Sequence, residues 1–126
     1  MKGVIISGVI AILILIGSIA YTNHIENVSE ELSDINKVII EALTAENYSK
    51  ASSSAKELND YLDSHRAILE ATGNHEEIDK IEMNISELVE YIDGGEKTDA
   101  LSNCRVLDFL FDHLPKNYEM KLENIL

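Results

Sequence analysis

The side chains best suited to chemistry in this sequence are four histidines, which stand among 23 acidic residues. A carboxylate-bridged di-iron site in a helical bundle requires a Glu-x-x-His motif on two helices. None of the four histidines has a glutamate three positions before it. The stretch that begins at His75 lacks the second histidine of a zinc protease helix, and no calcium-binding loop occurs. We therefore predict no metal ligand and no cofactor, and expect solvent exposure or helix-end positions for His24, His65, His75 and His113.

The single cysteine, Cys104, lies among apolar residues at helical spacing. This position predicts a buried, inert thiol, and one cysteine excludes an intrachain disulfide. The sequence contains no Gly-x-Ser-x-Gly elbow, no Ser-x-x-Lys motif and no glycine loop that would hold a phosphate. We expect no catalytic residue and no enzymatic activity.

An apolar run from Val4 to Ala20 precedes all of these residues, with no charged side chain between Lys2 and Glu26. At about 1.5 Å per residue, the segment up to Tyr21 is about 27 Å long, enough to cross the core of a bilayer. Ser18-Ile19-Ala20 also matches the cleavage pattern of a secretory signal peptide. An uncleaved anchor is favoured because the helical pattern continues past Ala20 and Tyr21 suits the membrane interface.

Charge gives the expected orientation. Lys2 is the only basic residue near the apolar run until Lys37, which places the amino terminus in the cytoplasm and residues 22–126 outside the cell. Nine basic and 23 acidic residues follow the run, a formal charge of −14. This charge argues against nucleic acid as a partner. We expect residues 1–21 to anchor the chain in the lipid bilayer and residues 22–126 to form one extracytoplasmic domain.

The periodicity of residues 22–126 predicts an all-α fold, an antiparallel bundle of about four helices arranged as two helical hairpins. The first helix continues the anchor to about Thr44, and the second covers about 49–71. Gly73 and the N-cap Asn74 separate the second helix from the third, which ends at Gly94-Gly95. The fourth is expected over about 98–114, closed by Pro115. The clearest apolar seam lies in the third helix: Ile78, Ile81, Ile85, Leu88 and Ile92.

A weak internal repeat with an offset of 49 residues relates the two hairpins. It pairs Ala51 with Ala100, Leu58 with Leu107 and Asp63 with Asp112, among others. A duplication would explain these matches, although a shared amphipathic pattern produces part of them.

The carboxy-terminal segment after Pro115 is too apolar for a disordered tail, because it includes Tyr118, Met120 and Leu122. Two uses are open: the segment folds back over the open end of the bundle, or its terminus docks into a partner. Folding back is favoured, because Met120 and Leu122 would otherwise be exposed to water. The candidate partner-binding residues are Leu122, Asn124, Ile125 and Leu126.

Four features resemble the bacterial family called domain of unknown function 4363. They are the short amino-terminal anchor, the stretch from His75 to Glu82, and the two motifs Phe111-Asp112-His113-Leu114-Pro115 and Leu122-Glu123-Asn124-Ile125-Leu126. A tryptophan associated with the second helix of the family is missing, and Tyr61 is the nearest substitute. The resemblance implies a single-pass or exported helical protein, often encoded beside a multi-spanning membrane protein, and it implies no activity.

These observations together predict a membrane-anchored, extracytoplasmic interaction module that serves as an accessory partner of another membrane protein. The alternative is a small-molecule or metal-binding sensor domain. A homo-oligomer is also possible, because Ser7, Ala11 and Ser18 lie near one face of the anchor and permit close helix approach.

Overall fold

The computed structural model describes residues 1–71 and 75–125, of which residues 117–125 are described by their backbone alone. The described chain consists of four helices: α1 (Lys2–Thr44), α2 (Tyr48–Glu70), α3 (His75–Asp93) and α4 (Lys97–Ile125). The described residues contain no strand. The predicted all-α fold is confirmed. The predicted end of the first helix at Thr44 agrees with the structure, and the predicted bounds of α2 and the predicted start of α4 differ from the observed ones by one residue.

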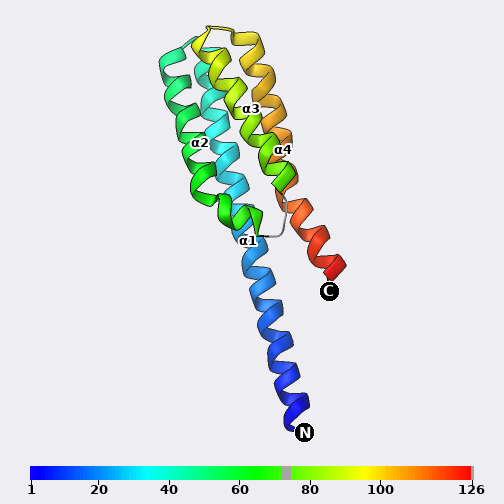
Figure 1. The fold of residues 1–126 in the computed structure, drawn as a ribbon. Helices are drawn as coiled ribbons and strands as arrows, with labels where there is room; N and C mark the ends of the chain where they lie inside the picture. The colour runs from blue at the N-terminus through cyan, green and yellow to red at the C-terminus, as the bar shows by residue number, and fades with distance from the viewer. Residues whose placement is uncertain (72–74, 126) are drawn as a thin grey trace.

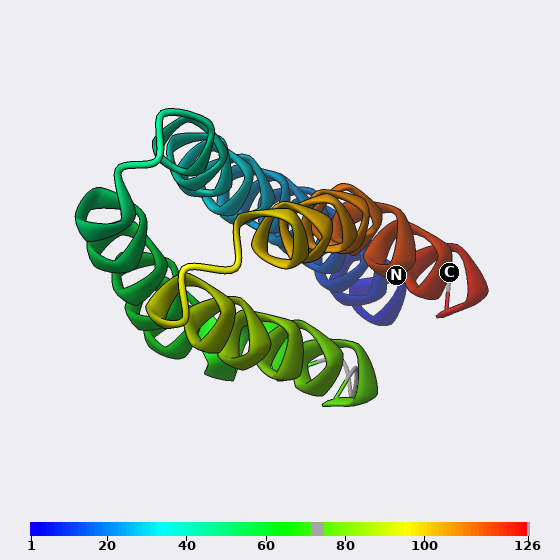
Figure 2. The same ribbon diagram turned by 90° about the horizontal axis from the view of Figure 1, so that it is seen from above.

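The four helices form an antiparallel bundle in which each helix packs against two others. α1 contacts α2 and α4, and α3 contacts the same two helices. Figure 1 shows that the amino-terminal half of α1 projects beyond the bundle, and Figure 2 shows the four helices around one shared interior. Short connections make sequential helices antiparallel neighbours, as the two predicted hairpins require.

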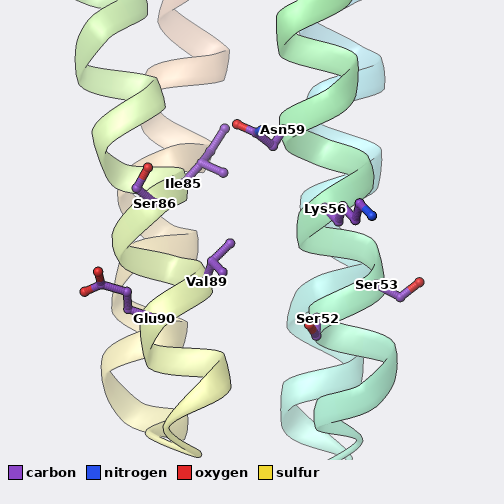
Figure 3. A pocket seen from close by; sticks show the side chains of 8 residues that line it. All are labelled: Ser52, Ser53, Lys56, Asn59, Ile85, Ser86, Val89 and Glu90. Carbon is purple, nitrogen blue, oxygen red and sulfur yellow. The ribbon is translucent and has the colours of Figure 1, made fainter.

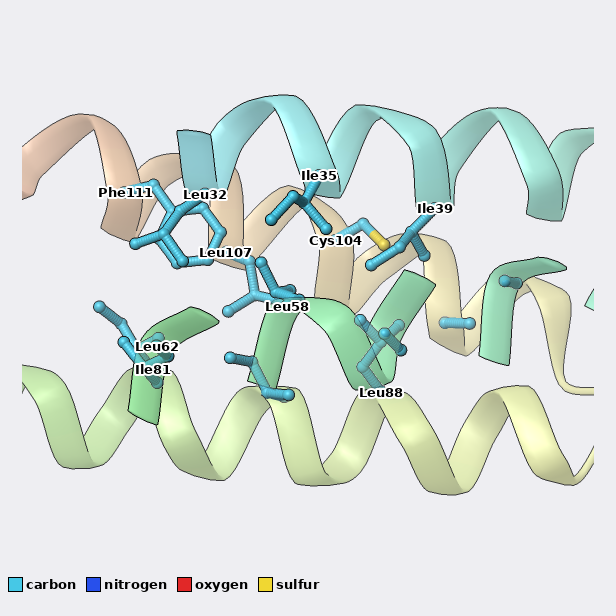
Figure 4. Close-up of a cluster of buried hydrophobic side chains, with 14 of the residues drawn as sticks. Leu32, Ile35, Ile39, Leu58, Leu62, Ile81, Leu88, Cys104, Leu107 and Phe111 are labelled. Carbon is cyan, nitrogen blue, oxygen red and sulfur yellow. The ribbon is translucent and has the colours of Figure 1, made fainter. Parts of the chain in front are cut away.

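The core is built from the apolar seams that periodicity predicts. All five isoleucines and leucines of the α3 seam are at most 2% exposed. The shared core takes side chains from all four helices, among them Ile35 of α1, Leu58 of α2, Leu88 of α3 and Leu107 of α4 (Figure 4). Each such aliphatic side chain contributes about 1.5–3 kcal/mol when it leaves water, so packing holds the bundle without a disulfide.

The expectation that Pro115 ends the fourth helix is wrong, because α4 continues through Pro115 to Ile125. Proline has no N–H, so the carbonyl of Phe111, four residues earlier, loses its helical donor. The hydroxyl of Ser29 on α1 donates a hydrogen bond to this same carbonyl. A neighbouring helix thus satisfies the group that proline leaves unpaired, and α4 tolerates the residue.

The two hairpin links are copies of each other at the predicted offset of 49 residues. In the first link, Ala45 N–H donates to Glu41 O, Glu46 N–H to Leu43 O, and Asn47 N–H to Ala42 O. The second link repeats these three bonds with Gly94, Gly95 and Glu96 as donors. The residue at the turn has positive φ in both, 56° at Glu46 and 68° at Gly95. The internal repeat is therefore present in the backbone as well as in the sequence.

The structure describes the residues that begin α2, but not residues 72–74, which precede α3. Asn47 caps α2, with its side chain accepting a hydrogen bond from the N–H of Lys50 at 3.2 Å. The predicted stop at Gly73 and the predicted cap at Asn74 lie outside the described residues.

Candidate functional site

The amino-terminal half of α1 presents an apolar surface that the rest of the protein leaves uncovered. Leu13 is 62% exposed and Val9 is 51% exposed. Among the described residues, α1 is the only helix long and apolar enough to cross a membrane, and none of its apolar window is buried. By length and composition this segment fits either a membrane anchor or a signal sequence.

The change from exposed to packed surface occurs within one helical turn. The hydroxyl of Tyr21 donates a hydrogen bond to the carbonyl of Ile68 near the end of α2, at 2.6 Å. Ile25, one turn further along α1, is fully buried in the core. The apolar segment and the core helix are therefore one continuous α-helix, held by the bundle from Tyr21 onward.

A groove of about 530 Å³ lies between α2 and α3 (Figure 3). Ile85 and Val89 of α3 point toward α2 and form its apolar floor. The other lining residues are polar and come from both helices: Ser52, Ser53, Lys56, Asn59, Ser86 and Glu90. The groove combines a hydrophobic floor with a polar rim, the usual composition of a binding site.

A second, shallower depression of about 580 Å³ adjoins the groove on the outer face of α3, and both are lined by Ser86. Its other lining residues are Met83, which is 63% exposed, and the acidic Asp79, Glu82 and Glu87. The two depressions together expose four carboxylates and one lysine.

Part of this acidic face is neutralised by Arg66 of α2. Its guanidinium forms ion pairs with Glu70 at 2.7 Å, with Asp79 at 3.7 Å and with Glu82. The carboxylate of Glu90, in contrast, has no cationic partner within 4.0 Å among the residues whose side chains are described. Glu90 is therefore an unpaired negative charge at the groove.

The histidines lie apart from the groove and in ordinary contacts. His24 and His65 have ring centroids 6.1 Å apart, and His65 also contacts the ring of Tyr61 at 4.2 Å. His75 lies 3.5 Å from a carboxylate oxygen of Glu70. The ring of His113 stacks on Phe109 at 4.2 Å. No group of three or more potential metal ligands occurs among the described residues.

Cys104 is fully buried in the α4 seam, as its position predicts. Burial, followed by the negative charge of Asp108, raises the pKa of the thiol to about 12. The thiolate is therefore disfavoured at neutral pH, and the thiol is shielded from solution reagents.

The contact between α1 and α4 contains a buried polar residue that the sequence reasoning missed. Asn36 is fully buried, and its Nδ2 donates to the carbonyl of Cys104 at 2.9 Å and to the carboxylate of Asp108 at 2.8 Å. Its Oδ1 has no hydrogen-bond partner in the part of the chain that the structure describes. An asparagine at an apolar position, between Leu32 and Ile39 at helical spacing, was the available signal.

The residues predicted to bind partners lie in the carboxy-terminal segment, where at most the backbone is described. The side chains of Leu122, Asn124 and Ile125, and the whole of Leu126, lie outside the described structure, so their role stays a prediction. The backbone of residues 122–125 continues α4 away from the bundle rather than folding back over its end (Figure 1). In the anchor, the hydroxyl of Ser7 donates to the carbonyl of Gly3 at 2.8 Å, a bond within the helix.

The fold defines the class of the protein: an antiparallel four-helix bundle whose first helix continues as an exposed apolar segment. The chain belongs to the family Domain of unknown function (DUF4363), whose model matches residues 19–125. This match confirms the resemblance seen in the sequence and covers the whole bundle. No curated protein and no solved structure matches the chain.

Proposed function

We propose that the protein is a membrane-anchored interaction module whose bundle lies outside the cytoplasm and binds another membrane protein. The observation that carries this proposal is the continuity of α1. One helix contains both the exposed apolar segment and the buried seam that begins at Ile25. A bilayer is the environment that removes such a segment from water.

Charge supports the orientation. The only basic side chain close to the apolar segment on its amino-terminal side is Lys2, and residues 22–126 have a formal charge of −14. Basic residues are retained on the cytoplasmic side. The bundle is consequently on the outer side in this proposal.

The interior of the bundle supports a binding role on its surface. The core is filled by aliphatic side chains from all four helices (Figure 4). No described cluster of histidine, cysteine and carboxylate side chains fits a metal ion. Polar and charged groups instead line outer depressions, where a protein partner has access.

Cysteine labelling on intact cells tests the orientation. The membrane-impermeant maleimide should label Lys50→Cys, at the exposed end of the bundle far from the anchor, because that position faces outward. Gly3→Cys should react only after the cells are opened. The native Cys104 is buried and serves as an unreactive background. Labelling of Gly3→Cys alone on intact cells would reverse the proposed orientation.

Co-purification tests the partner. The full chain, extracted in mild detergent, should retain a multi-spanning membrane protein that mass spectrometry identifies. A matched control replaces residues 4–20 by an unrelated apolar span, which keeps the anchor length but changes its helix face. If the same membrane protein is absent from both purifications and from a crosslinked sample, the proposed class of partner is wrong.

A further inference from the structure

The internal repeat shows why the groove between α2 and α3 exists. The offset of 49 residues superposes α1 on α3 and α2 on α4, so the α2–α3 contact corresponds to the α4–α1 contact. Ser52 then corresponds to Leu101, and Val89 to Ile40. Leu101 and Ile40 are partly buried against the core. A leucine thus occupies the place in one contact that a serine leaves open in the other.

A second pair of facing residues also differs between the two contacts. Asn36 and Asp108 form a hydrogen bond at 2.8 Å across the α1–α4 contact. Their counterparts across the α2–α3 contact are Ile85 and Asn59, which line the groove. The α1–α4 contact is therefore filled by a leucine and a hydrogen-bonded pair, and the α2–α3 contact has neither.

We propose that the α2–α3 groove binds a basic segment of a partner protein that inserts one aliphatic side chain at Ser52. The floor of Ile85 and Val89 suits an aliphatic group, because burial of that group removes apolar surface from water on both partners. Ser52 stands where the α1–α4 contact has Leu101, so the partner's inserted side chain should be about the size of a leucine. This proposal rests on the interaction role proposed above and assigns its binding surface.

Charge complementarity determines the rest of the partner's chemistry. Asp79, Glu82, Glu87 and Glu90 line the two adjoining depressions, and Lys56 and Arg66 are the cations beside them, so the local formal charge remains negative. Glu90 at the groove has no cationic partner among the described side chains. An acidic rim attracts lysine and arginine side chains and repels acidic ones. Exposed Met83 adds a flexible apolar contact beside the carboxylates.

The position of the groove identifies which part of a membrane partner reaches it. Tyr21 bonds to Ile68 at the base of the bundle. Asn59 and Ser52 precede Ile68 on α2 by nine and sixteen residues, about 14 and 24 Å at 1.5 Å per residue. The groove therefore contacts an extracytoplasmic loop or domain of the partner rather than its membrane-spanning helices.

A peptide-binding measurement tests the proposal on the full chain in phosphatidylcholine nanodiscs. The probe is a fluorescein-labelled peptide of Leu-Lys-Lys-Leu-Leu-Lys-Leu repeats, and a peptide with glutamate in place of lysine is its control. Anisotropy should rise with the lysine peptide alone, above the signal of empty nanodiscs, and it should fall with added salt. If neither peptide binds, or if both bind equally, the proposal is overturned.

Two matched variants place a leucine inside and outside the groove. Ser52→Leu restores the leucine of the other contact, so it should raise the melting temperature and weaken peptide binding about tenfold or more, as loss of a hot-spot contact does. Ser102→Leu makes the same change at an exposed position of α4 and should leave binding unchanged. Equal binding by both variants overturns the groove as the site.

If Ser52→Leu does not fold, two charge variants test the site by peptide binding instead. Glu90→Gln at the groove should weaken binding, and Glu57→Gln on the exposed face of α2 should not. An equal effect of the two changes would contradict a local site and indicate attraction by net charge alone. Incorporation into nanodiscs is measured before peptide is added, so failure of the anchor is distinguished from failure of the groove.

Discussion

Asn36 is the residue at which the two halves of the molecule differ most clearly. The repeat places Ile85 at the equivalent position of α3, and both side chains are buried. Asn36 instead bonds to Cys104 and Asp108 with one end and leaves its Oδ1 unpaired. A buried unpaired acceptor costs about 1–3 kcal/mol, so the unpaired Oδ1 of Asn36 lowers the stability of the α1–α4 contact. Buried asparagines are known to fix the register of packed helices, and Asn36 suits that role between α1 and α4.

Replacing Asn36 by isoleucine should raise the free energy of unfolding by about 1 kcal/mol, because the unpaired Oδ1 is removed and apolar surface is buried. The reverse change, Ile85→Asn, should lower it by about 3 kcal/mol, since a polar side chain replaces a buried aliphatic one in the core. Thermal unfolding of the full chain in detergent, followed by circular dichroism, measures both. Destabilisation by Asn36→Ile would show that its two hydrogen bonds outweigh the orphaned oxygen.

Cys104 leads to a prediction on pH. Its thiol has a pKa raised to about 12 in the fold, against about 8.5 in an unfolded chain. The stability that depends on the protonated thiol is complete below the unfolded value and is lost as pH rises from about 9 toward 12, by about 1.4 kcal/mol per pH unit. Cys104→Ala should reduce that slope. A thiol-reactive dye at pH 8 should react with Cys104 only after unfolding, and reaction with the native protein would contradict its burial.

At the scale of the helix, Ser29 and Pro115 are expected to act together. Ser29 supplies the donor that Pro115 removes from the carbonyl of Phe111. Ser29→Ala should therefore destabilise the protein by about 1–2 kcal/mol, and by about 1 kcal/mol less when Pro115→Ala restores the helical N–H. Urea unfolding of the two single variants and the double variant measures this coupling.

Ser64→Ala is the matched control for that cycle. Ser64 also donates to a helix carbonyl, that of Tyr61 at 2.8 Å, but no proline follows Tyr61 by four residues. The control should have a small effect that Pro115→Ala does not change. Independent, additive effects of Ser29→Ala and Pro115→Ala would mean that the hydroxyl does not compensate for the proline.

The two hairpin links allow a reciprocal exchange. Glu46 has φ of 56°, a left-handed conformation that disfavours residues other than glycine, and Gly95 occupies the equivalent position with φ of 68°. Glu46→Gly should stabilise the fold by about 0.5–1 kcal/mol, and Gly95→Glu should destabilise it by at least as much. The exposed ion pair of Glu46 with Lys97, at 3.6 Å, is worth too little to reverse the sign. Melting temperatures that shift in the same direction would disprove the equivalence of the links.

The elements also show how far the sequence determines the structure. The α3 seam was predictable because five apolar residues at helical spacing need one buried face, whatever packs against it. The end of α4 was not, since Ser29 relieves Pro115 from another helix, 86 positions earlier in the chain. The groove was also beyond prediction, because Ser52 leaves a space only where α3 faces it with Ile85 and Val89.

At the scale of the whole molecule, α1 joins the exposed apolar segment to the core of the bundle. The two parts belong to one continuous helix, so under the proposed membrane anchoring we expect a rotation or tilt of the segment to reach the α1–α2 and α1–α4 contacts. A bundle on a flexible linker would lack this coupling.

The mature protein should retain residues 1–20. Cleavage after Ala20 would cut α1 immediately before Tyr21, whose hydroxyl is bonded to Ile68 at the base of the bundle. The helix continues without a break across this site. Intact-mass measurement of membrane-purified protein should therefore give the full chain. As a control, Ser18→Leu with Ala20→Leu removes the small-x-small pattern that a signal peptidase requires. Both proteins should have their complete mass; a wild type that starts at Tyr21 beside an uncut variant would establish a signal peptide and refute the anchor.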